Sequence, residues 1–188
     1  MQLGFHIDQT RCTGCFTCVV ACKDWHDVPA GPASWRRVAV KEEGEWPEIF
    51  VAYSTSSCYH CAAPPCVPAC PAAAITKLPE NGIVVVDQEA CLGRDSCGGA
   101  CLSACPYEAP QFRDGADPKM EKCDLCRERW AEGRKPICVD ACPTRALDAG
   151  PLEELRARYG DVREGELFTY CASCRPSVNF KPKRRRTG

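Results

Sequence analysis

The sequence has few of the large apolar residues from which a protein core is normally built. Ile, Leu, Val and Phe together make up 33 of its 188 residues, and so low a share accompanies disorder when the net charge is high. The net charge is only −1 at pH 7, so disorder is not the expected state. Another source of stability is required, and metal or cluster binding can supply folding free energy that a small apolar core lacks.

Long hydrophobic runs are also missing. No stretch reaches the ~18 apolar residues of a membrane-spanning helix, and residues 1–6 contain no basic leader followed by an apolar run. Neither a membrane span nor a signal peptide is therefore expected. These absences favour a cytoplasmic protein, or one that is exported only in complex with a partner carrying the signal.

Motifs for substrate chemistry are absent as well. The chain contains no nucleophile–base set and no phosphate-binding glycine loop, so we expect a non-catalytic protein. Positive charge is concentrated only in residues 181–186, which we expect to form a solvated tail. No nucleic-acid partner is predicted.

Cysteine, in contrast, is abundant, with 18 residues. Sixteen of them form four quartets that each end in a C-x3-C step, and three quartets are followed directly by proline. The quartets are Cys12, Cys15, Cys18 and Cys22; Cys58, Cys61, Cys66 and Cys70; Cys91, Cys97, Cys101 and Cys105; and Cys123, Cys126, Cys138 and Cys142. Such internal repetition sets the architecture of a protein.

The first quartet has the C-x2-C-x2-C-x3-C spacing of bacterial ferredoxins. In that arrangement three thiolates in a tight loop bind three iron corners of one cubane cluster, and the fourth cysteine reaches the neighbouring cluster. We expect this fourth cysteine, Cys22, to start a helix that points away from the loop. Two such quartets then exchange their last ligands and bind two clusters. Soft thiolate ligands suit iron–sulfur clusters.

The other three quartets vary this spacing. The second and fourth have longer loops, which remain plausible because the entropy cost of loop closure grows slowly with length. The third, C-x5-C-x3-C-x3-C, is irregular, and Gly98 and Gly99 provide the backbone freedom to compensate. We expect four cysteine ligands there too, with a three-iron cluster or an unusual ligand as the alternatives.

The order of the quartets predicts how they pair. The second and third are separated by one expected strand, residues 82–87, and form a contiguous two-cluster unit, which leaves the first and fourth to pair around it. The predicted ligand sets are Cys12, Cys15, Cys18 and Cys142; Cys123, Cys126, Cys138 and Cys22; Cys58, Cys61, Cys66 and Cys105; and Cys91, Cys97, Cys101 and Cys70. The alternative pairs the first quartet with the second and the third with the fourth.

The expected fold is α+β, with two ferredoxin-like units made of small strands and short helices around the clusters. The outer unit comprises residues 1–57 and 115–188, and the inserted unit comprises residues 58–114. Residues 4–8 are expected as a strand, residues 19–25 as a short helix, and residues 151–159 as a helix with proline at its start and glycine after its end. Residues 23–57 are expected to be an insertion, and the four tryptophans are expected as core or interface anchors.

A disulfide framework and a zinc array are the alternatives to iron–sulfur clusters. The first does not account for four similar quartets with three Cys-Pro endings, and the second does not account for the x2-x2-x3 run. Cys171 and Cys174 lie outside the quartets and are free thiols, a disulfide or half of a site completed elsewhere. His60, between Cys58 and Cys61, is expected as an exposed loop residue, with tuning of the neighbouring cluster as the alternative.

Several stretches resemble a known family. They are Arg11-Cys12-Thr13-Gly14-Cys15, Ala21-Cys22-Lys23-Asp24, Pro64-Pro65-Cys66-Val67, Ala104-Cys105-Pro106-Tyr107 and Lys122-Cys123-Asp124-Leu125-Cys126, with Ala141-Cys142-Pro143. The sequence is similar to the four-cluster iron–sulfur electron-transfer subunits of the molybdopterin oxidoreductase (dimethyl sulfoxide reductase) family.

This resemblance implies four 4Fe-4S clusters and a large catalytic partner that holds a molybdenum- or tungsten-pterin centre. It also implies a membrane anchor subunit in many members of the family. A polyferredoxin, or an electron-transfer subunit of the hydrogenase type, is the alternative function. A zinc- or disulfide-stapled binding module without redox work is the alternative from another class.

Overall fold

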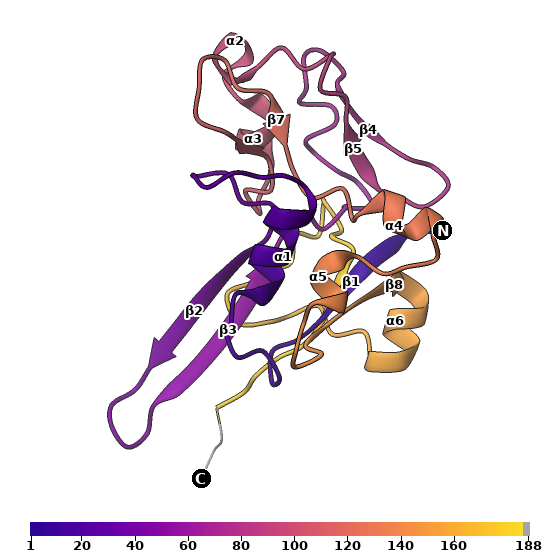
Figure 1. Cartoon of the computed structure of the whole chain (residues 1–188). Helices are drawn as coiled ribbons and strands as arrows, with labels where there is room; N and C mark the ends of the chain where they lie inside the picture. Colours follow the sequence, from indigo (N-terminus) through magenta and orange to yellow (C-terminus); the bar gives the residue numbers. More distant parts are fainter. Residues whose placement is uncertain (186–188) are drawn as a thin grey trace.

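The computed structural model describes residues 1–185 and has an α+β fold of small strands and short helices (Figure 1). Its elements in sequence order are β1 (Leu3–Asp8), α1 (Thr17–Trp25), β2 (Arg37–Glu43), β3 (Phe50–Ser56), β4 (Ile75–Lys77), β5 (Val84–Val86), α2 (Arg94–Cys97), α3 (Ala100–Ala104), β6 (Gln111–Phe112), β7 (Met120–Glu121), α4 (Arg127–Ala131), α5 (Ile137–Asp140), β8 (Leu147–Pro151), α6 (Leu152–Tyr159) and β9 (Val178–Lys181). The predicted fold class is confirmed.

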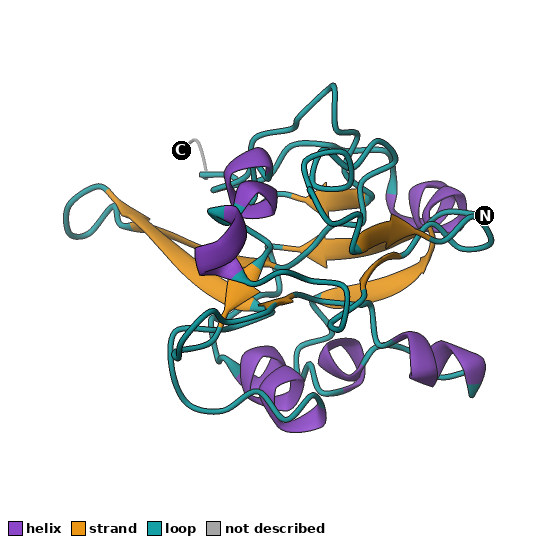
Figure 2. Ribbon diagram, turned by 90° about the horizontal axis from the view of Figure 1, so that it is seen from above, coloured by secondary structure: helices purple, strands orange, loops and turns teal. Residues whose placement is uncertain are grey.

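A three-stranded sheet in the order β8-β1-β9 ties the two ends of the protein together. The central strand β1 is antiparallel to β8 and parallel to β9, and all six of its residues are buried. Successive side chains of a strand alternate between its two faces. Phe5 and Ile7 lie on one face of β1 beside Val178 and Phe180 of β9, and the small or polar residues Gly4, His6 and Asp8 lie on the other. Helices lie on both sides of the strands (Figure 2).

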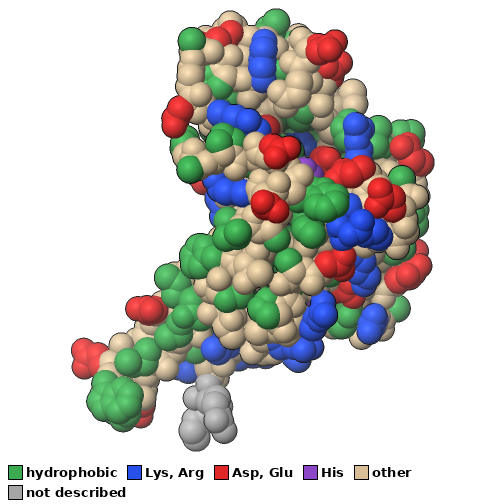
Figure 3. Space-filling view, in the orientation of Figure 1, with side chains coloured by type: hydrophobic (Ala, Val, Ile, Leu, Met, Phe, Trp, Pro, Cys, Tyr) green, Lys and Arg blue, Asp and Glu red, His purple; other side chains and the backbone are tan. Residues whose placement is uncertain are grey.

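The predicted insertion contains a long hairpin, which we call the arm (residues 37–56). Its strands β2 and β3 pair antiparallel from Arg37↔Ser56 to Glu43↔Phe50 and project from the body (Figure 1). The tip is apolar and flanked by acidic side chains (Figure 3), and Trp46 there is 85% exposed. A core position is therefore wrong for this tryptophan.

A second layer of short hairpins carries the middle of the sequence. Strands β4 and β5 pair with each other, as do β6 and β7, and α2 and α3 lie beside them (Figure 1). Ile75, Val84, Phe112 and Met120 form a small core here together with cysteines. The β6–β7 pair joins residues on either side of position 114, so the two predicted units share this hairpin, and the division into units stays a prediction.

The predicted segments are largely confirmed, with one correction that concerns the sites. The helix predicted at residues 151–159 is α6, and the strand predicted at residues 4–8 is β1. The helix predicted at residues 19–25 begins earlier, at Thr17. Cys22 therefore does not start a helix, and it lies one turn after Cys18 on the same helix, because the tight loop ends at Phe16 in a left-handed conformation.

Within residues 1–185, every helix is too short or too polar to cross a lipid bilayer. The predicted tail ends outside the described residues, at Arg186. Of its described part, Lys181 belongs to β9 and its ammonium lies 3.2 Å from an Asp8 carboxylate oxygen, while Arg185 lies 3.9 Å from Glu43. Ion pairs with Asp8 and Glu43 thus connect this part of the tail with the rest of the protein.

Two glycines paired across the β1–β8 ladder differ in the space around them. Gly4 pairs with Gly150. A Cβ on Gly4 would lie 2.3 Å from the carbonyl oxygen of Ser177, whereas a Cβ on Gly150 would have its nearest neighbour, a Leu155 methyl carbon, at 3.8 Å. The close approach of the Ser177 backbone therefore requires glycine at position 4 but not at position 150.

We expect Gly4→Ala to destabilise the protein by about 1–3 kcal/mol, since the backbone must move to relieve the contact. Gly150→Ala is the matched control and should change the stability by less than about 1 kcal/mol. Thermal unfolding of the cluster-loaded proteins measures the stability of both variants. Each kcal/mol lost from the free energy of unfolding should lower the Tm by about 2–4 °C. Equal midpoints for the two variants would contradict the described packing.

His6 is buried in the same sheet in its neutral form. Its ring stacks on Tyr159 with 3.9 Å between ring centroids, and its Nδ1 donates to the Asn179 side-chain oxygen at 3.1 Å. Burial lowers the pKa of His6, and the hydrogen bond to Asn179 opposes this shift. The unfolded protein therefore takes up a proton near pH 6.5 that the folded protein does not.

The stability contributed by neutral His6 is therefore complete above about pH 6.5 and is lost as the pH falls below that value. We expect the Tm of the wild type to drop more between pH 7.5 and pH 5.5 than the Tm of His6→Gln, which cannot titrate. An identical pH dependence in the two proteins would show that His6 is not buried in the neutral form.

Candidate iron–sulfur sites

Two cavities are each lined by four cysteines from two different quartets. Cys12, Cys15, Cys18 and Cys142 line the first, which we call site I. Cys70, Cys91, Cys97 and Cys101 line the second, which we call site IV. The equal numbers of sulfur ligands suit the same kind of occupant.

Two further groups of four cysteines lie in the interior. Site II consists of Cys22, Cys123, Cys126 and Cys138, and burial followed by the proximity of the other three raises the pKa of Cys22. Site III consists of Cys58, Cys61, Cys66 and Cys105, and burial followed by the other three raises the pKa of Cys61 to about 12. The structure thus brings together the four predicted sets, while their role as cluster ligands stays a prediction.

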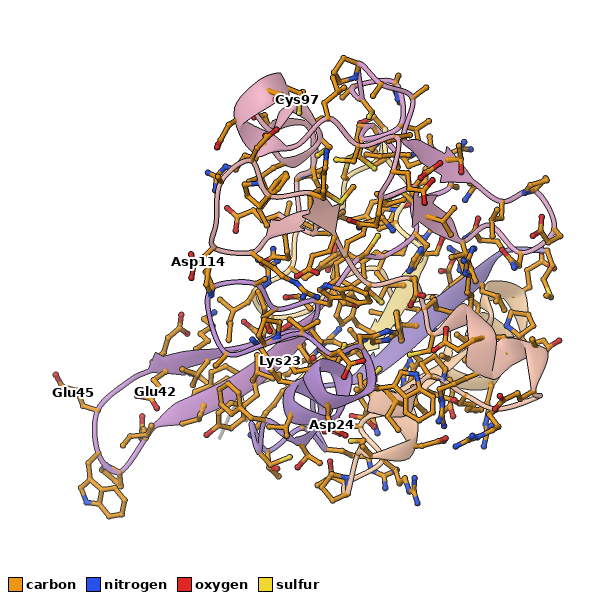
Figure 4. All side chains as sticks on the ribbon, turned by 45° about the horizontal axis from the view of Figure 1, so that its top comes forward. Lys23, Asp24, Glu42, Glu45, Cys97 and Asp114 are labelled. Atoms are coloured by element: carbon orange, nitrogen blue, oxygen red, sulfur yellow. A yellow bond between two sulfur atoms is a disulfide. The ribbon has the colours of Figure 1, made fainter. Side chains whose placement is uncertain are left out.

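The sites follow one another through the molecule. Cys138 of site II lies near Cys18 of site I, and Cys123 of site II lies near Cys58 of site III. Sites III and IV are linked by shared segments, because Cys66 and Cys70 are on one loop and α3 leads from Cys101 to Cys105. In Figure 4, Cys97 of site IV lies far from Asp24, which is on the same helix, α1, as Cys18 of site I and Cys22 of site II.

The three Cys-Pro endings form the same turn. In each, the residue three positions after the cysteine donates its N–H to the cysteine carbonyl oxygen at 3.2 Å. These residues, Ala73, Glu108 and Arg145, all have positive φ, between 50° and 53°. Proline fits the second position of such a turn because its φ is already set. The repeated proline therefore turns the backbone over the site.

One backbone N–H points at a cysteine sulfur in each site. The donors and acceptors are Ala146 and Cys142 in site I at 3.3 Å, Leu125 and Cys123 in site II at 3.4 Å, Ala109 and Cys105 in site III at 3.5 Å, and Met120 and Cys91 in site IV at 3.5 Å. Hydrogen bonds of this kind favour the charged thiolate form that ligates iron. The donor set therefore fits an iron–sulfur cluster at each site.

The irregular third quartet reaches site IV through an additional helical turn. Arg94–Cys97 form α2, and Gly98 and Gly99 follow in the left-handed region with φ of 66° and 64° before α3 begins. This pair of glycines places Cys97 and Cys101 on the same cavity as Cys70 and Cys91. The four cysteines of site IV thus favour a four-iron cluster over the three-iron alternative.

The expectation that His60 is an exposed loop residue is wrong. The side chain is fully buried, and its Nδ1 accepts the N–H of Val84 at 3.0 Å. Burial, followed by the charges of Lys122 and Lys77, holds the pKa of His60 well below its usual range. Its Nε2 has no hydrogen-bond partner within residues 1–185. A cluster with acceptor sulfides beside Cys58 and Cys61 would satisfy this donor.

Three cations near the sites were not recognised from the sequence. Lys77 donates to the carbonyl oxygen of Cys61 at 2.9 Å, and the buried Lys122 donates to that of Cys123 at 3.1 Å. Arg36 is buried next to sites I and II. Lysine and arginine are normally exposed, and no spacing distinguishes these three from the other basic residues of the protein.

Cys171 and Cys174 form a disulfide outside the four sites. The carbonyl oxygens of Cys174 and Arg175 accept the N–H groups of Ala63 and Ala62 at 3.0 and 2.8 Å. Among the alternatives left open by the sequence, the structure therefore has the disulfide, and this segment covers the loop that carries site III.

Burial keeps most of the thiols protonated when no metal is bound. It raises the pKa of Cys66 to about 12 and the pKa of Cys101 to about 11. Cluster binding must therefore displace these protons. Cys15 differs, because it is exposed and hydrogen bonds with Thr17 lower its pKa. Site I is thus the site with the most accessible sulfur ligand.

Comparison with known proteins identifies the same chemistry. Residues 49–152 and residues 11–75 each match a model described as a 4Fe-4S dicluster domain. The sequence is 43% identical over 189 residues to a component of the anaerobic dimethyl sulfoxide reductase of Escherichia coli (strain K12), covering 96% of this protein and 89% of that one. The component of the same name from Haemophilus influenzae is 45% identical, with coverages of 97% and 90%. A component of the sulfite dehydrogenase of Allochromatium vinosum is 38% identical, with coverages of 98% and 84%.

We expect oxidative damage to begin at site I, because Cys15 is its exposed ligand. After brief exposure of the cluster-loaded protein to air, thiol alkylation followed by peptide mass spectrometry should label Cys12, Cys15, Cys18 and Cys142 severalfold sooner than the cysteines of site III. Earlier labelling of Cys58, Cys61, Cys66 and Cys105 would contradict the described difference in exposure.

Proposed function

This protein belongs to the 4Fe-4S dicluster proteins that serve as electron-transfer subunits in the molybdopterin oxidoreductase (dimethyl sulfoxide reductase) family, and we propose that sites I to IV hold its four clusters. As an iron–sulfur subunit of this family it carries four 4Fe-4S clusters and relays electrons to or from a molybdenum- or tungsten-pterin catalytic subunit. The chemistry on the substrate belongs to that partner.

The observation that carries the ligand proposal is the exchange of the fourth cysteine in every site. Sites I and II exchange Cys22 and Cys142, and sites III and IV exchange Cys70 and Cys105. Exchange of the last ligand is the arrangement in two-cluster ferredoxins. It supports an outer unit of residues 1–57 and 115–188 with sites I and II, and an inserted unit of residues 58–114 with sites III and IV.

Each cluster, when bound, supplies a centre that accepts and releases one electron. The protein contributes the thiolates, the N–H groups that point at their sulfurs, and an interior that keeps water away from sites II and III. The adjacency of sites I, II, III and IV supports a linear relay. Site I at the exposed Cys15, and site IV beside the exposed Leu92, are then the two ends where partners exchange electrons with the relay.

We also propose that the protein is cytoplasmic, or leaves the cytoplasm only in complex with a partner that carries the export signal. The sixteen cysteines of the sites must be reduced when clusters are inserted, and the cytoplasm keeps thiols reduced. A membrane anchor subunit is a further proposed partner. The 43% identity to a component of a dimethyl sulfoxide reductase, along nearly the whole sequence, favours a subunit of a molybdopterin oxidoreductase over a polyferredoxin or a hydrogenase subunit.

Iron and sulfide analysis of the anaerobically purified native complex tests the proposal. We expect about sixteen irons per copy of this protein, together with molybdenum or tungsten in a co-purifying large subunit. Cys15→Ser should lower the iron content by up to four, because it removes a ligand of site I. The matched control is Cys171→Ser combined with Cys174→Ser, which should retain about sixteen irons.

Zinc in place of iron would refute the relay function. An unchanged iron content and an unchanged EPR spectrum in Cys15→Ser, or iron loss in the double control variant, would refute the ligand assignment alone.

A further inference from the structure

Arg36 is a buried cation whose guanidinium is hydrogen-bonded to hydroxyl groups. It directly precedes β2 and is 1% exposed. Its guanidinium donates to the hydroxyl oxygens of Thr55 and Ser57, each at 3.1 Å, and lies 4.6 Å from the centre of the Phe5 ring. Within residues 1–185 it forms no ion pair with a carboxylate. A buried charge without a counter-charge is strongly unfavourable.

Arg129 shows how the same protein neutralises a buried arginine elsewhere. Arg129 is also 1% exposed, but it forms an ion pair with the carboxylate of Asp140. Arg36 has the same burial and no such partner within the described residues. Its counter-charge must therefore come from groups other than aspartate and glutamate.

The neighbours that would supply this negative charge, once they ligate clusters, are cysteine sulfurs of two different sites. Burial acts to lower the pKa of Arg36, but Cys138, Cys18, Cys123 and Cys22 outweigh it and raise the pKa above its ordinary value. Cys18 belongs to site I, and the other three belong to site II. The guanidinium is thus shared between two sites.

The guanidinium lies close to cysteine sulfurs on both sides. Toward site I, the Thr55 hydroxyl that accepts from Arg36 lies 3.8 Å from the sulfur of Cys18. Toward site II, burial raises the pKa of Cys138, and the charge of Arg36 together with a hydrogen bond from its side chain counteracts this. The cation therefore lies where the first two steps of the proposed relay meet.

We propose that Arg36 is the common counter-cation of sites I and II and raises the reduction potentials of both clusters together. The inference rests on the proposed function, because it requires clusters at those sites. Reduction adds one negative charge to a cluster, and a fixed positive charge in a low-dielectric interior stabilises the reduced form. Arg36 is thus a positioning residue that adjusts two neighbouring centres at once, with little screening by salt.

EPR-monitored redox titration of the anaerobically purified complex tests the proposal. The proteins compared are the wild type, Arg36→Met, which removes the charge, Arg36→Lys, which keeps it, and Arg158→Gln. Arg158 is the control because its side chain is 70% exposed and it therefore carries a solvated charge. The iron content is measured on every sample.

In Arg36→Met, the equilibrium constant for reduction should fall at least tenfold at two of the four clusters. For a one-electron couple this lowers each of these two midpoint potentials by about 59 mV or more. The other two potentials should stay unchanged. Arg36→Lys should keep all four potentials within that limit, and so should Arg158→Gln. This pattern would support a role for the charge itself.

Four unchanged potentials in Arg36→Met would overturn the proposal, and so would a fall in Arg36→Lys as large as that in Arg36→Met. If Arg36→Met does not assemble its clusters, Arg36→Gln, which also removes the charge but keeps a hydrogen-bond donor, is judged by the same criterion. A wild-type iron content far below that of four clusters would instead contradict the proposed function. Four wild-type clusters with potentials that do not respond to Arg36→Met would contradict only the role of Arg36.

Discussion

The concentration of thiolate charge in a small interior is the constraint on which the rest of the structure depends. Each site takes three cysteines from one quartet and the fourth from another, so no quartet can complete a site by itself. Residues near position 15 must meet Cys142, and residues near position 60 must meet Cys105. The β8-β1-β9 sheet supports these long-range contacts, because its central strand precedes the first quartet and its neighbours follow the fourth. The small share of aliphatic residues fits this arrangement, since the cysteines are themselves members of both apolar cores.

The same constraint explains the polar groups in the interior. The backbone supplies an N–H to a sulfur in each site. The buried or half-buried Arg36, Lys77 and Lys122 add positive charge beside sites I to III. These cations would be costly in an ordinary core. Their burial beside cysteines, with neutral groups as hydrogen-bond partners, is consistent with an interior that carries negative charge when the clusters are bound.

The spacing of the cysteines predicted the fold class, and the order of the quartets predicted the four sets that the structure brings together. Spacing alone did not exclude the alternative pairing of the first quartet with the second, because it does not fix which quartets lie side by side. The helix α6 followed from proline before it and Gly160 after it. The burial of His60 and Arg36 was not predictable, because it depends on β5 and on the arm, which approach from other parts of the sequence. The start of α1 was predicted two residues too late for a local reason, since the left-handed Phe16 allows the helix to start at Thr17. Pro71, Pro106 and Pro143 were noticed in the sequence, but the identical turns they form became clear only in the structure.

The central claim is that exchange of the fourth cysteine joins the first quartet with the fourth and the second quartet with the third. Anomalous scattering at the iron absorption edge, from crystals of the native complex, tests it most directly because it locates the iron atoms without any variant. We predict four groups of iron in a row, the first bounded by Cys12, Cys15, Cys18 and Cys142 and the next by Cys22 with the fourth quartet. Iron bounded by Cys12, Cys15, Cys18 and Cys70 would instead join the first quartet with the second, and would contradict the account.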